Sequence, residues 1–301
     1  MNDSITGEVR SGPVVVGVDG SDHAFAAALW AADEAVRLAR PLHLVHATDT
    51  DGREAFIMEN EVRRFCAEGR ELLDDTAAAV SERCPGLAVT TQLSRRGPVP
   101  TLHGAASDDG IIVVGNRGLG GFNSLLLGSV GLKVAAGART AVIVVRGATE
   151  TAGAGPVLVG VRDEHDLVCA RHAAREAAAR KSELRILHIG NVLHPVGDVA
   201  AMLDDVNEPA PGRMGSVVVV ADLIREEFPD LSLRVDAESS PSVAAVLVEA
   251  SNHADLLVMG GKRSPGHIGP NLGRATHSLI HHAHCPVELI PRRDAGHRST
   301  P

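Results

Sequence analysis

Residues 111–130 read IIVVGNRGLGGFNSLLLGSV, and no other stretch indicates the fold class as clearly. Residues 111–114 form a short apolar run with the length and β-branching of a buried strand. The run ends at Gly115, and a glycine-rich loop leads to residues 129–138, SVGLKVAAGA, which have the composition of a helix. A strand that passes through glycines into a helix start can hold a phosphate, because backbone N–H groups approach an anion closely there and the helix end carries partial positive charge.

The glycines follow a fixed spacing: Gly115, two residues, Gly118, nine residues, then Gly128 and Ser129. This pattern is neither the phosphate loop that ends in Gly-Lys-Ser/Thr nor the GxGxxG of dinucleotide-binding proteins. It resembles the G-x2-G-x9-G-[S/T] motif of the ATP-binding universal stress proteins. An ordinary glycine-rich turn would explain any one of these glycines, but it explains four matching positions between a strand and a helix poorly.

The length of 301 residues suggests about two domains. Hydrophobic residues make up 44% of the chain but aromatic residues only 2%, so aliphatic side chains must fill the cores. The net charge of −9 argues against binding to nucleic acid or to acidic membranes. Because no signal core begins the chain and no apolar run reaches the ~18 residues of a membrane span, we expect a cytoplasmic protein.

The chain repeats itself. PVVVGVDG at 13–20 is matched by PVLVGVRD at 156–163, and IIVVGNRG at 111–118 by LLVMGGKR at 256–263. An offset this constant indicates duplication. The predicted organisation is a tail at 1–12, a first domain at 13–147, a linker at 148–155, a second domain at 156–292 and a tail at 293–301.

Each copy alternates short β-branched runs with alanine-rich stretches, which is typical of βαβ units around a parallel sheet. The predicted fold class is α/β, with two tandem Rossmann-like domains, each a five-stranded parallel sheet flanked by helices. In the first copy we expect strands near 14–18, 42–47, 87–93, 111–114 and 141–146, and helices near 22–39, 59–82, 98–107 and 129–138. In such sheets a ligand lies beyond the carboxyl ends of the strands.

The resemblance implies an ATP site in the first domain, with Mg²⁺ as the accompanying ion. It implies that Asp19, directly after the first strand, lies beside adenine and ribose and helps to position the ion. A turn or helix-capping role for Asp19 is the alternative, since Asp-Gly-Ser-Asp is good capping chemistry. The complete predicted site consists of Gly17, Val18, Asp19, Ala47, Val114, Gly115, Asn116, Arg117, Gly118, Gly120, Gly121, Gly128, Ser129 and Val130.

Within that site the resemblance implies two groups. The backbone at Ala47 would face adenine, and Val18 and Val114 would flank the base. The triphosphate would be held by Arg117, Gly118, Gly128, Ser129 and Val130. No catalytic residue is predicted, because the nearest lysine, Lys133, fits a solvated helix face; at most we expect slow ATP hydrolysis.

The second copy departs from this pattern. Arg162 stands where the first copy has Asp19, and Arg263 stands where it has Gly118. Arg274 follows the helix-start glycine in place of serine, and Pro265 and Pro270 in the interval remove backbone donors. We therefore expect no ATP in the second domain, although its arginines leave binding of another anion open.

Three histidines, His277, His281 and His284, are spaced to share one face of the predicted last helix. Such a face can bind a transition metal, but no carboxylate or cysteine in the helix completes the set, so no metal site is predicted. The four cysteines form no CxxC pair and are expected to be reduced structural thiols. His46 is expected to be a core histidine.

Proteins with this resemblance are ATP-dependent regulators or sensors in stress and growth control. The resemblance implies that the two domains of one chain mimic the family's dimer, with the strands at 142–145 and 287–290 as natural edges for pairing. A homodimer of the whole chain is a further hypothesis, and a regulatory protein partner is expected whose identity the sequence does not give. Two alternatives stay open: a slow ATPase or phosphotransferase, and a nucleotide-free interaction protein.

Overall fold

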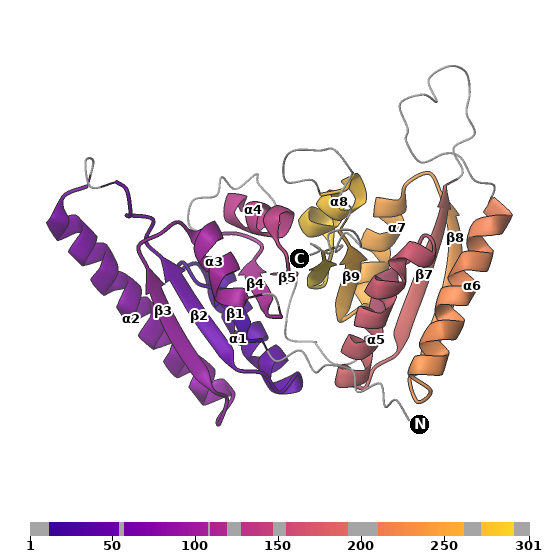
Figure 1. The fold of residues 1–301 in the computed structure, drawn as a ribbon, viewed down its shortest axis with the longest axis horizontal. Helices are drawn as coiled ribbons and strands as arrows, with labels where there is room; N and C mark the ends of the chain where they lie inside the picture. Colours follow the sequence, from indigo (N-terminus) through magenta and orange to yellow (C-terminus); the bar gives the residue numbers. More distant parts are fainter. Residues whose placement is uncertain are drawn as a thin grey trace, which may run out of the picture. The chain divides into compact units, whose positions relative to one another are not determined.

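The computed structural model describes residues 12–53, 57–107, 109–118, 128–146, 155–191, 210–261 and 272–291. The chain divides into two compact units, Met1–Ile143 and Val144–Pro301. Strands and helices alternate through each unit (Figure 1). The elements from the first unit are β1 (Val14–Gly17), α1 (Asp22–Arg37), β2 (Leu42–Ala47), α2 (Glu59–Arg83), β3 (Val89–Ser94), α3 (Pro98–Ala106), β4 (Ile111–Gly115), α4 (Ser129–Gly137) and β5 (Ala141–Val145), at which the division falls.

The strands of the first unit lie in the order β3-β2-β1-β4-β5. Strand β1 is central, and Val14 is opposite Leu42 of β2 on one side and Ile111 of β4 on the other, in parallel register. Helices α1 and α2 pack together, and so do α3 and α4, as right-handed crossovers on the two faces of a sheet require (Figure 1). From β1 the chain adds strands first on one side (β2, β3) and then on the other (β4, β5). The strand order therefore reverses between β1 and β4, which is where this kind of sheet binds ligands.

The core strands have the composition that burial on both faces requires. All three valines of β1 are fully buried, and four of the five residues of β4 are buried. Runs without alternation are typical of parallel sheets covered by helices on both sides. Helix α1 begins after Ser21, whose hydroxyl accepts a hydrogen bond from Ala24 N at 3.2 Å.

The second unit repeats this architecture with strand order β10-β9-β6-β7-β8. Strand β6 is parallel to β7 and β9, with Val157 opposite Leu184 and Leu256. Its elements are β6 (Val157–Gly160), the 3₁₀ turn η2 (Glu164–Asp166), α5 (Leu167–Arg180), β7 (Leu184–Asn191), α6 (Ala210–Glu227), β8 (Leu233–Ser240), α7 (Val243–Ala250), the 3₁₀ turn η4 (Ser251–His253), β9 (Leu256–Gly260), α8 (Arg274–His282) and β10 (Val287–Ile290).

The predicted fold class is confirmed: both units are α/β with parallel sheets flanked by helices. The predicted element bounds in the first unit agree with the structure within one or two residues. Within the described ranges, no helix has the length and apolarity that crossing a membrane requires.

One prediction about the last helix is wrong. Helix α8 ends at His282, and Ala283 has extended backbone angles (φ −59°, ψ 152°), so His284 does not share a helical face with His277 and His281. The main reason is a tertiary contact: His284 N donates to Ser251 Oγ at 2.9 Å and so does not continue the helix, while Pro286 disfavours helical angles at Cys285 just beyond it. His277 and His281 do stand together, with ring centroids 4.5 Å apart.

Candidate functional site

The candidate site lies at the carboxyl ends of β1, β2 and β4, next to the start of α4. Gly17 ends β1, and a Cβ there would come 3.2 Å from the Leu102 side chain of α3, so even one methyl group would require that side chain to shift. Val18, which follows, is buried, and its N–H continues the sheet by donating to Val45 O at 2.9 Å. This hydrogen bond fixes the direction in which the chain leaves β1.

Asp19 is half-buried at this point, and its Oδ1 accepts hydrogen bonds from Ser21 N at 3.0 Å and from Ser21 Oγ at 2.7 Å. Ser21, not Asp19, caps helix α1. The aspartate therefore orders the turn that carries the cap, while its Oδ2 faces the backbone of Gly118. The turn role and the site role expected from the sequence are both compatible with this placement.

A histidine on the neighbouring strand supports the same turn. His46 Nδ1 lies 2.8 Å from Val18 O, which precedes Asp19. The second unit contains the same contact, with His188 Nδ1 at 3.0 Å from Val161 O. We had expected only a core role for His46. The recurrence of histidine in LHLVHA and LRILHIG was the signal in the sequence for this supporting contact.

Strand β4 brings the glycine loop to the site. A Cβ on Gly115 would come 2.7 Å from the carbonyl oxygen of His23 in α1, so only glycine allows this approach of strand to helix. Val114 is buried at the end of the strand, and Ala47 is half-buried at the end of β2. The three predicted positions thus lie at the same edge of the sheet.

The two ends of the nine-residue interval are held together. Gly128 N donates to Asn116 O at 2.9 Å, and a Cβ on Gly128 would lie 3.7 Å from Gly118 N. The predicted residues Gly120 and Gly121, within 119–127, lie outside the described residues. This bond and this short distance place Gly118 beside the start of helix α4.

Helix α4 begins at Ser129, as the sequence predicts, with Gly128 as its cap in extended conformation (φ −68°, ψ 148°). The first N–H groups of any helix lack an intrahelical partner, and Gly128 makes no side-chain cap here, so within the described part of the chain these groups are open to a ligand. Ser129 and Val130 are exposed here. Arg117 Nε is buried without a hydrogen-bond partner among the described residues. A buried guanidinium donor in this state is costly unless an acceptor reaches it, and a phosphate oxygen is such an acceptor.

The corresponding edge of the second unit has a different chemistry. The backbone N and the Nε of Arg162 both donate to Asp166 Oδ2, at 3.0 and 3.3 Å. Asp166 is buried, and its Oδ1 lies 3.5 Å from the position of a Cβ on Gly260, the counterpart of Gly115. An ion pair within the protein therefore stands at the place where the first unit has Asp19. Gly273 caps α8 and Arg274 begins it, while Arg263, Pro265 and Pro270 lie outside the described residues.

Comparison with known proteins gives a consistent result over the whole length. The model of the Universal stress protein family matches residues 11–146 and again residues 154–291. Universal stress protein Rv2624c of Mycobacterium tuberculosis is 26% identical over 288 residues, which cover 95% of this chain and 98% of that protein. A universal stress protein of Mycolicibacterium smegmatis is 28% identical over 295 residues, covering 93% and 97% of the two chains.

Among solved structures, the crystal structure of a universal stress protein from Archaeoglobus fulgidus superposes with a TM-score of 0.71 and covers 96% of this chain and 99% of its own. The sequence identity in that alignment is 16%, so the similarity concerns the fold. Both units of the chain take part in it.

Proposed function

The chain belongs to the universal stress protein family, and on that premise we propose that its first unit binds ATP with Mg²⁺ and that the protein is a cytoplasmic, nucleotide-dependent regulator or sensor of stress or growth. The observation that carries this proposal is the closed glycine loop. Gly118 and Gly128 meet beside Asp19, next to the uncapped start of α4.

The charges and donors at this place suit a nucleoside triphosphate. The start of α4 and the buried Nε of Arg117 offer donors to phosphate oxygens. Asp19 offers a carboxylate at the same edge, which is the ligand type that Mg²⁺ prefers alongside phosphate oxygens. Val18 and Val114 are apolar and buried, as the surroundings of a base should be. The proposed site keeps all fourteen predicted residues, of which Gly120 and Gly121 rest on the sequence motif alone.

We propose that the second unit does not bind ATP. The Arg162–Asp166 pair stands at the position of Asp19, so the second unit places a guanidinium where the first unit offers a carboxylate to a nucleotide and its metal ion. One nucleotide per chain is the expected stoichiometry.

The decisive experiment is a count of bound nucleotide. The full-length protein is purified, equilibrated with ATP and Mg²⁺, desalted and denatured, and the released nucleotide is identified and counted by chromatography and mass spectrometry. We expect about one ATP per chain, lost in Asp19→Ala and in Gly118→Glu. Asp222→Ala is the matched control, since Asp222 is an exposed aspartate of α6 that pairs with Arg225 on the same helix.

The other outcomes are equally informative. Two nucleotides per chain would refute the exclusion of the second unit. No nucleotide at all would refute the ATP proposal and place the protein among interaction proteins that work without a ligand. Release of ADP well above the Gly118→Glu variant would favour a slow ATPase.

Two further parts of the proposal concern assembly. We propose a homodimer of this chain that engages a regulatory protein partner. Light scattering should then give about twice the chain mass of 31.4 kDa. A single mass of 31.4 kDa over a wide range of protein concentration would contradict the dimer.

A further inference from the structure

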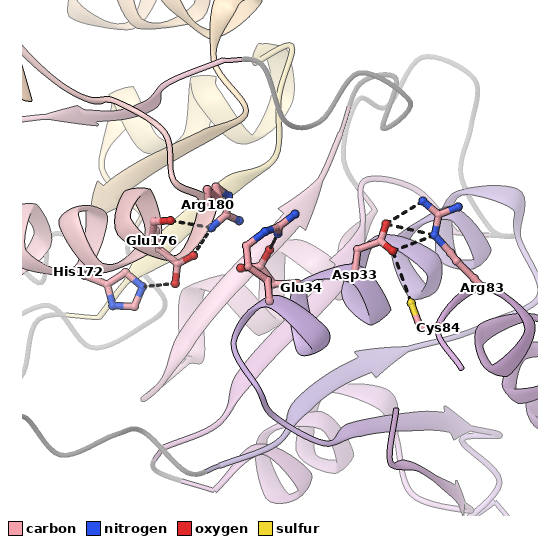
Figure 2. A network of polar contacts seen from close by, with 8 residues as sticks. Asp33, Glu34, Arg83, Cys84, His172, Glu176 and Arg180 are labelled. Atoms are coloured by element: carbon pink, nitrogen blue, oxygen red, sulfur yellow. Dashed lines mark hydrogen bonds and ion pairs between the residues drawn. The ribbon is translucent and has the colours of Figure 1, made fainter. Parts of the chain in front are cut away.

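A buried group of ionisable side chains in the second unit has no role in the proposed nucleotide site. His172 and Glu176 come from α5, and Glu288 comes from β10. Their exposed fractions are 6%, 4% and 0%. Figure 2 shows His172, Glu176 and Arg180 directed toward one another along the same face of α5. Buried charges are costly, so such a group needs a physical reason.

The distances bring three potential ligand atoms together. His172 Nε2 lies 2.8 Å from Glu288 Oε1 and 3.7 Å from Glu176 Oε1. One nitrogen and two carboxylate oxygens, one from each residue, all lie within 4.8 Å of one another, and this is the one such group of three found within the described ranges. Ligands at about 2.0–2.2 Å from a zinc-sized ion stand roughly 3–3.5 Å apart, so small side-chain movements would complete the geometry.

The second carboxylate oxygen of Glu288 is the independent observation. Glu288 Oε2 is buried and has no hydrogen-bond partner among the described residues. The hydrogen bond from His172 to Oε1 leaves this second oxygen unsatisfied in a side chain that solvent does not reach. An unsatisfied buried carboxylate oxygen destabilises the fold, and a bound cation would remove that cost.

Glu176 is already oriented for a ligand role. Its Oε2 forms an ion pair with Arg180, one helical turn further along α5, which leaves Oε1 on the side of His172. An arginine that pairs with the other oxygen of a metal-binding carboxylate fixes the orientation of that carboxylate. The arginine also compensates one of the two carboxylate charges, so a divalent ion would not leave a large excess of negative charge.

We propose that His172, Glu176 and Glu288 form a binding site for one divalent transition-metal ion, of which Zn²⁺ is the best match. Imidazole nitrogen together with carboxylate oxygen favours such ions over Mg²⁺ and Ca²⁺, which prefer oxygen ligands. Three protein ligands leave a position for water. The site is structural in character, because it links helix α5 to strand β10 within the second unit. The sequence predicts no metal site. His172 and Glu288 are 116 residues apart in the chain, so no local motif joins them.

The competing explanation is a proton in place of the ion. A protonated His172 between two carboxylates, with Arg180 beside them, would also balance the charges. The two explanations differ in one measurable respect: only the metal site changes its optical and thermal properties when an ion is added to a metal-free chain.

The test uses the full-length chain without an affinity tag, freed of metal with a chelator. Co²⁺ serves as the spectroscopic probe and Zn²⁺ as the competitor. We expect one Co²⁺ per chain with visible absorption bands, displacement by one equivalent of Zn²⁺, and a rise in melting temperature with Zn²⁺. Glu288→Gln keeps the size of the side chain but removes the charge, so it should weaken Co²⁺ binding by tenfold or more. Glu176→Gln should do the same.

The matched control is the double variant His277→Ala, His281→Ala, because this histidine pair on α8 is a second place among the described residues where a transition metal could bind. Binding that survives in this variant supports the proposal. Binding lost in it, binding unchanged in both glutamate variants, or no stoichiometric ion in the wild-type chain would each overturn the proposal. The wild-type result decides even if the glutamate variants fail to fold. ATP binding in the first unit is measured separately, so the two proposals can fail independently.

Discussion

The carboxylate of Asp19 lies against the backbone of Gly118, so that a Cβ on residue 118 would overlap Asp19 Oδ2. Asp19 cannot move away without cost, because its other oxygen accepts two hydrogen bonds from Ser21, the cap of α1. The end of β1 and the glycine loop after β4 are therefore coupled through one contact. Any side chain at position 118 must disturb the turn at Asp19.

This contact predicts that Gly118→Ala, a change of a single methyl group, weakens ATP binding. The methyl displaces Asp19 and weakens its hydrogen bonds to Ser21. We expect an increase of about tenfold in Kd, equivalent to about 1.4 kcal/mol. Isothermal titration with ATP and Mg²⁺ measures it. Gly104→Ala in α3 is the control, because a Cβ there meets nothing within 4 Å. Equal affinities in the two variants would contradict the role of Gly118.

The packing of α2 on the sheet gives a second prediction. Gly69 is buried in α2, and a Cβ there would come 2.6 Å from the His46 ring and 2.8 Å from Leu93 Cδ1. Gly69→Ala should therefore destabilise the protein by about 1–3 kcal/mol, despite the better helix propensity of alanine. Denaturant unfolding measures the loss. Gly104→Ala should be neutral or slightly stabilising, and a Gly69→Ala variant as stable as that control would refute the close packing.

The stability of the fold at acid pH should depend on Asp236 in β8. Burial alone would raise the pKa of its carboxyl, but hydrogen bonds from Arg185 Nε at 2.5 Å and from Arg234 Nε at 2.8 Å outweigh burial, and the pKa is lowered. A lowered folded-state pKa stabilises the fold above the unfolded value of about 4, and that stability is lost as the pH falls through the folded value.

We therefore expect Asp236→Asn to reduce the free energy of unfolding by about 1 kcal/mol at pH 7, with a difference from wild type that shrinks below pH 4. Unfolding curves at several pH values test this. Asp222→Asn, on the exposed face of α6, should have a much smaller effect. A deficit of Asp236→Asn that stays constant down to low pH would refute the linkage.

The thiols give a prediction for alkaline pH. Burial, with the nearby charge of Asp255 as a second cause, raises the pKa of Cys285 to about 12. Burial and Asp33 also raise the pKa of Cys84, whose Sγ lies 3.5 Å from Asp33 Oδ1 (Figure 2). Few thiolates form at these two sites near pH 8, so iodoacetamide should label Cys66, which is half-buried, before Cys84 and Cys285. Mass spectrometry gives the order, and early labelling of Cys285 would contradict it.

The same raised pKa has a stability consequence. The unfolded chain would ionise Cys285 above a pH of about 9, whereas the folded chain holds the proton until about pH 12, so folding stability should fall across this window. Across this window the folding stability of Cys285→Ala should fall less steeply with pH than that of the wild type. The stability of Cys66→Ala should fall with the wild-type slope. Parallel slopes for all three proteins would exclude Cys285 as a cause.

The sequence predicted what local pattern determines. Strand β4 and the start of α4 at Ser129 were both predictable, because β-branched runs, glycines and helix formers occur in a recognisable order. The contact of Asp19 with Gly118 was predictable only as proximity at one sheet edge, since the side-chain direction depends on the hydrogen bonds of Ser21.

Other features depend on tertiary contacts that no local pattern encodes. The end of α8 before His284 depends on a hydrogen bond to Ser251, 33 residues earlier in the chain. The group of His172 and Glu288 joins a helix to a strand across 116 residues. In the sequence Glu288 is a single charged residue in a short apolar strand, and its burial becomes clear only in the folded sheet.

The internal pair of Arg162 and Asp166 has a consequence for how such a chain would report on its surroundings. Two equal sites in one molecule could influence each other and give a steep, switch-like response to nucleotide level. If nucleotide binds only in the first unit, as proposed, the single site would fill along a simple hyperbola within each chain. The duplicated chain would then respond gradually to nucleotide concentration, and any cooperativity in nucleotide binding would have to arise between chains.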